Sequence, residues 1–149
     1  MLIKLFLDGI ILGADIWNDI QKEDTYVTAQ YPFECLNAKT HGLRKGELVT
    51  VTAGSGVGKS SFCRHVALSL LEQKYTVGYI ALEESVKRSA LGIMGVHLKK
   101  PLHLTREGID ETQLHTAFTS TIGNGNFYLY NHLFHKNQFL SLSNLHNFY

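Results

Sequence analysis

The stretch that decides the fold is Glu47–Ser60, ELVTVTAGSGVGKS, in which a β-branched run meets a glycine-rich loop. The run Glu47–Ala53 is typical of a buried strand. The apolar side chains of Lys59–Gln73 recur at helical spacing. A strand, a glycine-rich loop and a helix in this order predict a phosphate-binding loop, because the glycines let successive backbone N–H groups turn toward phosphate oxygens.

This loop predicts a site for a nucleoside triphosphate with Mg²⁺. The helix that follows adds the positive end of its dipole, Lys59 can reach the β- and γ-phosphates, and the Ser60 hydroxyl can ligate Mg²⁺. Ala53 stands where the strict pattern has glycine, which leaves the Gly-Lys-Ser core intact. A dinucleotide fingerprint is excluded, because Lys59 occupies the place of its third glycine. The expected nucleotide-binding residues are Ala53, Gly54, Ser55, Gly56, Val57, Gly58, Lys59, Ser60 and Ser61.

The segments around the loop predict an α/β fold. Thr76–Leu82 (TVGYIAL) is a second candidate for a buried strand, so that Glu47–Leu82 would form one strand–helix–strand unit with a parallel sheet and a right-handed crossover. The other expected elements are a helix over Ser85–Met94, a helix capped by Asp110 and Gln113 that ends near Gly123, an Asn124-Gly125 turn, and a strand over Phe127–Tyr130.

The chain is expected to have three parts. Residues 1–30 hold a short helix over Ala14–Lys22 and a linker, with the helix expected to pack on the domain's own core rather than on a neighbour. Residues 31–131 form the α/β domain. Residues 132–149 are a tail rich in Asn, His, Phe and Leu, without a clear hydrophobic period.

Composition limits the class of protein. The 149 residues are 44% hydrophobic with a net charge of +1, which predicts one compact domain and no broad basic field. No stretch is long and apolar enough to span a bilayer, so a soluble, cytoplasmic protein without a membrane partner is expected. Cys35 and Cys63 are interpreted as reduced thiols, and the eight histidines show no metal-ligand spacing. Seven basic residues form no continuous stripe, most of them are expected to be solvated, and none is assigned to DNA. They are Arg44, Lys45, Arg64, Lys87, Arg88, Lys99 and Lys100.

Two long segments resemble the motor domain of phage helicase–primases and, more distantly, of Twinkle and the DnaB-type replicative helicases. They are HGLRKGELVTVTAGSGVGKSSF, from His41, and GYIALEESVKRSALGIMGVHL, from Gly78. The Leu36-Asn37 pair matches as well, and the resemblance runs from about Ala14 to about His132. It implies a RecA-like P-loop core and a homo-hexameric ring that unwinds DNA 5′-to-3′. It also implies ATP or dTTP with Mg²⁺, single-stranded DNA, a primase partner or fused domain, and the host cytoplasm if the protein is phage-encoded.

The resemblance also implies a catalytic pair, Glu83 and Lys59. Glu83 ends the second expected strand, where the family's glutamate activates the water that attacks the γ-phosphate, and a general base must reach its water. Glu84 is the neighbouring alternative, and it is interpreted as an acid at the start of the next helix, where it would stabilise the helix dipole.

Several parts of such a motor are missing from this sequence. No Asp or Glu follows Glu111, so the aspartate that closes a later strand in the family is absent. The phosphate-sensing residue, the DNA loops and the arginine finger would lie further on. We interpret the tail after Asn131 as the product of a truncation or frameshift, which leaves the sheet incomplete at its C-terminus. The alternatives are another RecA/KaiC-like ATPase or small-molecule kinase, and an inactive remnant that only binds nucleotide or a helicase ring.

Overall fold

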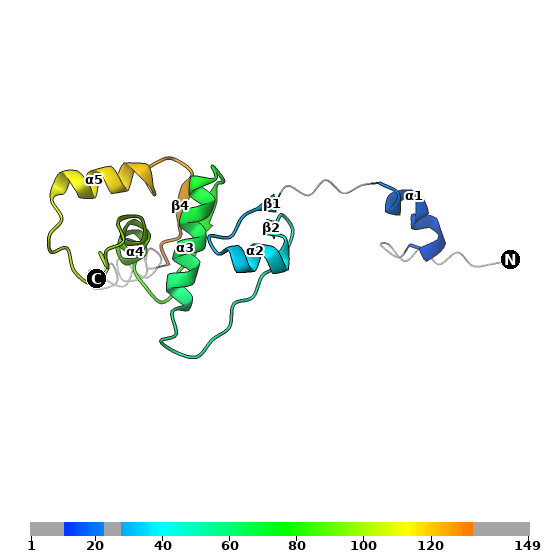
Figure 1. The fold of residues 1–149 in the computed structure, drawn as a ribbon, viewed down its shortest axis with the longest axis horizontal. Coiled ribbons are helices and arrows are strands. Elements are labelled where there is room, and N and C mark those ends of the chain that lie inside the picture. Colours follow the sequence, from blue (N-terminus) through cyan, green and yellow to red (C-terminus); the bar gives the residue numbers. More distant parts are fainter. Residues whose placement is uncertain (1–10, 23–27, 133–149) are drawn as a thin grey trace, which may run out of the picture.

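The computed structural model describes residues 11–22 and 28–132. It is an α/β structure with a two-stranded parallel sheet flanked by helices, as expected. Figure 1 shows the elements in chain order. They are the 3-10 helix η1 (Gly13–Ile16), α1 (Trp17–Ile20), β1 (Thr28–Ala29), α2 (Glu34–Thr40), β2 (Leu43–Arg44), α3 (Lys59–Glu72), β3 (Val77–Tyr79), α4 (Val86–Leu98), α5 (Glu111–Ser120) and β4 (Phe127–Leu129).

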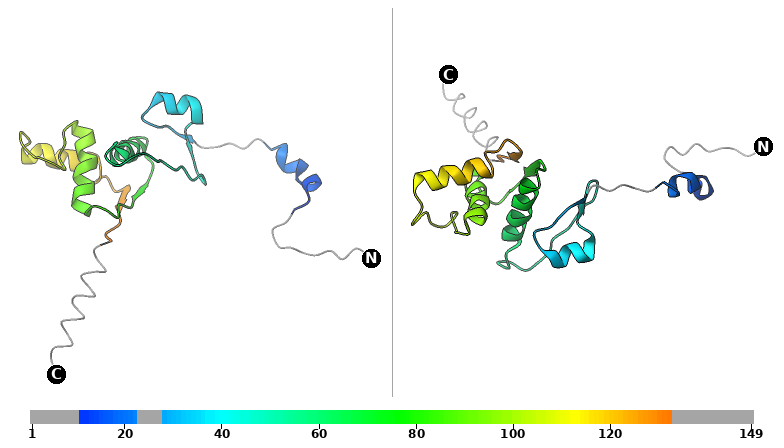
Figure 2. Two further views of the ribbon diagram at one scale, coloured as in Figure 1. Left: turned by 90° about the horizontal axis from the view of Figure 1, so that it is seen from below. Right: turned by 45° about the horizontal axis from the view of Figure 1, so that its top comes forward.

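The parallel sheet joins two segments far apart in the sequence. β3 pairs with β4 so that Val77 lies opposite Phe127 and Tyr79 opposite Leu129. The connection between them runs through α4 and α5, and Figure 1 and Figure 2 both show α4 between α3 and α5. The strand expected at Phe127–Tyr130 is confirmed within one residue, and its turn is built on Gly125 with φ of +88°.

The prediction of a strand before the glycine-rich loop is wrong. Residues 47–54 have no strand assignment, and Leu48 is 93% exposed. The strand–helix–strand unit expected over Glu47–Leu82 is therefore not formed, and β3 covers only the middle of the run Thr76–Leu82. The physical reason is that a strand exists only when a neighbour takes up its backbone hydrogen bonds. Among the described residues, no strand pairs with residues 47–54.

The expected helices are present with local start and stop contacts. α3 begins at Lys59 as expected, and α4 extends past the expected Met94 to Leu98. Gln113 N–H donates to the Asp110 carboxylate at 2.7 Å, which caps α5. Helix α5 ends as Gly123 N–H donates to Phe118 C=O at 2.8 Å.

Two apolar clusters hold the helices and the sheet together. The first joins α3 to the sheet through Ala67, Leu71 and Val77. The second joins α4, the 99–110 loop and α5 through Met94, Leu102 and Ala117. Leu102 is 2% exposed, so this loop is anchored in the core rather than lying on the surface.

The part before the phosphate loop contains a helix that was not expected. α2 lies next to the antiparallel pair β1–β2, in which Thr28 is opposite Arg44. The Asn37 side chain ties this unit together, since it accepts from Tyr31 N–H at 2.8 Å and donates to Tyr31 C=O at 2.9 Å. Phe33 stacks on Phe62 of α3 with ring centroids 5.4 Å apart, which connects the unit to the helix that follows the glycine-rich loop.

The helical segment expected near the N-terminus is confirmed, but the prediction that it packs on the core of the domain is wrong. η1 and α1 cover Gly13–Ile20, and no residue of either helix is buried. Trp17 is 61% and Ile20 62% exposed, so these apolar side chains do not pack into the core. The rest of the segment expected at residues 1–30 lies partly outside the described residues, as does almost all of the tail at 132–149.

Candidate nucleotide-binding site

The glycine-rich loop has the backbone shape that a phosphate cradle needs. Gly56 and Gly58 have φ of +76° and +99°, where L side chains are strained. All of residues 53–58 are exposed. Gly58 is the N-cap of α3 and supplies no side-chain acceptor, so the first N–H groups of that helix are not capped by a side chain. The loop can therefore present N–H groups and a helix dipole to an anion.

Lys59 folds back over this loop. Its ammonium donates to Ala53 C=O at 2.8 Å and to Gly54 C=O at 2.9 Å. These contacts hold the ammonium beside the cradle, and a phosphate in the loop would compete with the two carbonyls for it. The neighbouring Ser60 is exposed, with its hydroxyl free to meet a metal ion bound to the phosphates.

A cavity of about 910 Å³ brings the expected catalytic groups together. Lys59, Ser60 and Glu83 all line it. Ala53, Gly54, Ser55, Gly56, Val57, Gly58 and Ser61 are not among its lining residues, and Ser61 lies at a separate hollow. The apolar wall includes Val49, Val51 and Val77, which face the cavity from the unpaired run and from β3.

Glu83 is exposed, whereas the adjacent Glu84 is held in place. Glu84 Oε2 accepts from Arg64 Nη2 at 2.7 Å, with side chains that are only 15% and 8% exposed. Its other oxygen accepts from Ser89 Oγ at 3.0 Å. Arg88 lies further away, with Nε 3.8 Å from Glu84 Oε2. Glu84 therefore fixes the turn between β3 and α4, and Glu83 next to it is left free at the cavity.

Arg64 is an exception to the expectation that most of these basic residues are solvated. Arg64 is 7% exposed, and it packs so closely on α4 that a Cβ at Gly92 would lie 2.4 Å from its Nε. The sequence held a sign of this: Arg64, Ala67, Leu68 and Leu71 follow the spacing of one helix face, and all four are buried. Glu84, expected to be a helix-start acid, is the partner of Arg64.

Burial around this ion pair changes two pKa values. Desolvation raises the pKa of Tyr79 above its ordinary 10.0, and the nearby Arg64 opposes that rise. Desolvation lowers the pKa of His103 below 6.5, and the positive charges of Arg64 and Arg88 lower it further. Tyr79 and the His103 imidazole are thus both held toward their neutral forms.

Within residues 11–22 and 28–132, no group of three or more His, Cys, Asp or Glu side chains could hold a metal ion. Cys35 and Cys63 are both free and exposed. None of the helices in this part of the chain is long and apolar enough to cross a membrane. The Mg²⁺ expected at Ser60 would take its other ligands from phosphate oxygens and water.

The sequence is similar to a phage DNA helicase/primase. Over 100 residues it is 36% identical to the DNA helicase/primase of Enterobacteria phage T3, an overlap that covers 64% of this chain. The chain spans 18% of the length of that relative. No protein-family model matches the sequence. The similarity supports a relationship to helicase–primases.

Proposed function

We propose that this chain binds a nucleoside triphosphate with Mg²⁺ at residues 53–61, as part of the RecA-like motor of a replicative DNA helicase. The observation that carries the proposal is the cavity in which Lys59 and Ser60, directly after the glycine-rich loop, share one space with Glu83. Similarity to the phage T3 helicase/primase supports the same motor class. The substrate is ATP or dTTP.

Each group has a distinct role in this proposal. The loop N–H groups and the start of α3 hold the phosphates, and Lys59 leaves the Ala53 and Gly54 carbonyls to neutralise them. Ser60 contributes an oxygen to Mg²⁺, which supplies charge neutralisation between the phosphates. Glu83, exposed at the cavity, takes the proton from an attacking water.

Residues 112–149 contain no Asp or Glu, so no second carboxylate for the metal is assigned within them. In an intact relative the motor would act as a homo-hexamer on single-stranded DNA, with a primase domain or partner. We expect this chain to bind nucleotide and not to unwind DNA by itself.

Titration of the purified chain with fluorescent ATP and dTTP analogues in the presence of Mg²⁺ tests the proposal. Saturable binding is expected, and Lys59→Ala should weaken it about 10- to 100-fold, because one ammonium with charge-assisted bonds to phosphate is lost. Lys74→Ala, which removes an exposed lysine at the other end of α3, should leave binding unchanged. Equal affinity of the chain and Lys59→Ala would refute the site.

A second measurement separates binding from catalysis. Glu83→Gln keeps the size of the side chain and removes the base, so nucleotide affinity should be retained while any hydrolysis is lost. Neither the chain nor Glu83→Gln should unwind a forked DNA substrate. Robust unwinding by the purified chain would contradict the expectation that it does not unwind DNA by itself.

A further inference from the structure

A hollow of about 300 Å³ lies on the side of α3 that faces away from the nucleotide cavity. The α3 residues that line the cavity include Lys59, Cys63 and Val66, whereas Ser61, Arg64 and His65 line the hollow. At 100° per residue, these two sets fall on opposite faces of the helix. We call this second space the basic hollow, and the residues that matter for it are Arg64, Gly92, Gly95, Lys99, Lys100 and His103.

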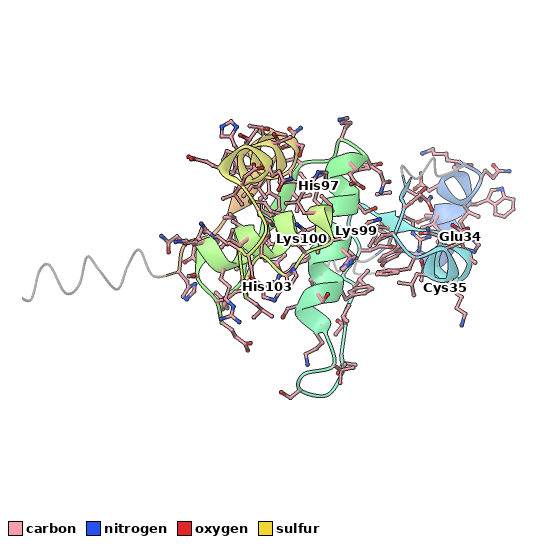
Figure 3. All side chains as sticks on the ribbon, turned by 60° about the vertical axis from the view of Figure 1, so that its left-hand side comes forward. Glu34, Cys35, His97, Lys99, Lys100 and His103 are labelled. Carbon is pink, nitrogen blue, oxygen red and sulfur yellow. The ribbon has the colours of Figure 1, made fainter. Side chains whose placement is uncertain are left out.

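The basic hollow is lined by positive and neutral groups alone. Arg64, Lys99 and Lys100 carry its charges, and no Asp or Glu is part of its wall. Glu84 balances Arg64, but within residues 11–22 and 28–132 no carboxylate lies within ion-pair distance of Lys99 or Lys100. Figure 3 shows these two lysines and His103 at the end of α4, beside α3. Lys99 and Lys100 therefore bring two positive charges to this wall without a partner carboxylate among the described residues.

The lysines are not needed to cap α4. A basic side chain near a helix C-terminus can stabilise the last carbonyl groups. Here the backbone does this, since Lys99 N–H donates to Val96 C=O at 3.2 Å and Lys100 N–H to Gly95 C=O at 2.9 Å. The Lys100 ammonium donates to Gly108 C=O at 3.0 Å, which steadies the side chain without neutralising it.

The wall of the basic hollow is rigid. Leu102 is 2% exposed and anchors the segment that carries Lys99, Lys100 and His103. A Cβ at Gly95 would lie 2.5 Å from Lys100 C=O, so this segment packs directly on the α4 backbone. Gly92 and Gly95 contribute no side chains to this wall. The backbone positions of these residues are therefore fixed by packing before a ligand binds.

Arg64 adds an unsatisfied donor. It is more than nine-tenths buried and lines the basic hollow, and its Nε has no hydrogen-bond partner among the described residues. A buried N–H without an acceptor costs about 1–3 kcal/mol. Oxygen atoms of an anion are the acceptors that this donor lacks, and they would supply the negative charge that Lys99 and Lys100 lack.

We propose that the basic hollow binds a phosphate group. Phosphate offers several acceptor oxygens and up to two negative charges, which match the positive charges of Lys99 and Lys100 and the N–H donors of Arg64 and His103. The phosphate belongs either to a small free ligand or to the backbone of a nucleic acid. This proposal stands apart from the nucleotide cavity, because the two spaces lie on opposite faces of α3.

The test is a phosphate titration of the full chain in the Lys59→Ala background, which weakens the competing phosphate loop. The ring C–H resonances of His103 are followed by NMR, with chloride of equal ionic strength as the reference. Phosphate should shift them saturably and should raise the pKa of His103, because a bound anion opposes the effect of Arg64 and Arg88 while Glu84 stays in place.

Two double variants decide whether the lysines carry the binding. Lys99→Gln/Lys100→Gln should weaken phosphate binding at least about tenfold. Lys39→Gln/Lys74→Gln removes the same charge from exposed positions outside the hollow, and Lys74 shares the left-handed backbone of Lys99, with φ of +68° and +54°. This control should bind as before. Circular dichroism verifies that both variants are folded.

Every outcome bears on the proposal. A shift that is retained in Lys99→Gln/Lys100→Gln, or no shift at all with either phosphate or a short single-stranded oligonucleotide, overturns it. If the oligonucleotide acts at much lower concentration than phosphate, and salt weakens it steeply, the ligand is a nucleic-acid backbone. If only phosphate acts, the ligand is a small one. Loss of nucleotide binding at Lys59 leaves these results unchanged, so the two proposals fail separately.

Discussion

Gly92→Ala tests the contact on which the buried ion pair depends. In an exposed helix interior, this change stabilises a protein by about 1 kcal/mol, because alanine has the higher helix propensity. At position 92 the new Cβ would lie 2.4 Å from Arg64 Nε and 2.6 Å from its Cζ. The guanidinium must therefore move, and it cannot do so while Nη2 stays 2.7 Å from Glu84 Oε2.

The size of the effect follows from the burial of the pair. Breaking a buried ion pair costs about 3–5 kcal/mol, because one charge is left without its partner. Glu84 keeps its bond from Ser89 at 3.0 Å, which favours the lower end of that range. After the gain in helix propensity, Gly92→Ala should lower the free energy of unfolding by about 2 kcal/mol.

Urea unfolding followed by circular dichroism measures this in two backgrounds. The Arg64→Ala/Glu84→Gln background lacks both the guanidinium that blocks the new Cβ and the carboxylate that would lose its partner. There the same Gly92→Ala change should raise the free energy of unfolding by about 0.5–1 kcal/mol. Gly95→Ala is the matched control, because its Cβ would meet the Lys100 carbonyl at 2.5 Å and should destabilise both backgrounds alike. If Gly92→Ala is equally stabilising in both, Arg64 does not pack on α4 as described.

Two further changes test other contacts. Asn37→Ala should lower the free energy of unfolding by about 1–3 kcal/mol, because the N–H and C=O of the buried Tyr31 both lose their side-chain partner; a loss within measurement error would contradict this. His103→Gln should flatten the pH dependence of stability. Because the pKa of His103 is lowered in the folded state, the unfolded chain takes up the proton first as the pH falls. The contribution of His103 to the free energy of unfolding is therefore complete above about pH 6.5 and is lost as the pH falls through the folded pKa. The free energy of unfolding is measured across that pH window in both proteins. If its slope against pH is the same in His103→Gln, His103 is not the group responsible.

Local sequence predicted helices α3, α4 and α5 with little help from distant contacts, although it did not predict α2. Helix α3 begins at Lys59, α5 is capped by Asp110, and the turn before β4 uses Gly125, all as expected. Helix hydrogen bonds and caps lie within a few residues of one another, so a pattern of a few letters is enough to predict them. For the same reason the sequence predicted a glycine-rich loop over residues 53–58, and the structure shows that Gly56 and Gly58 are its left-handed residues.

Tertiary structure decided which strands exist and which charges are buried. The β-branched run Glu47–Ala53 has high strand propensity but no partner among the described strands, while the short Val77–Tyr79 has one in β4. Arg64 looked like any other basic residue until α4 and Glu84 enclosed it. A strand and an ion pair both need a second segment from elsewhere in the chain. Their formation therefore depends on how distant elements pack, which no local pattern specifies.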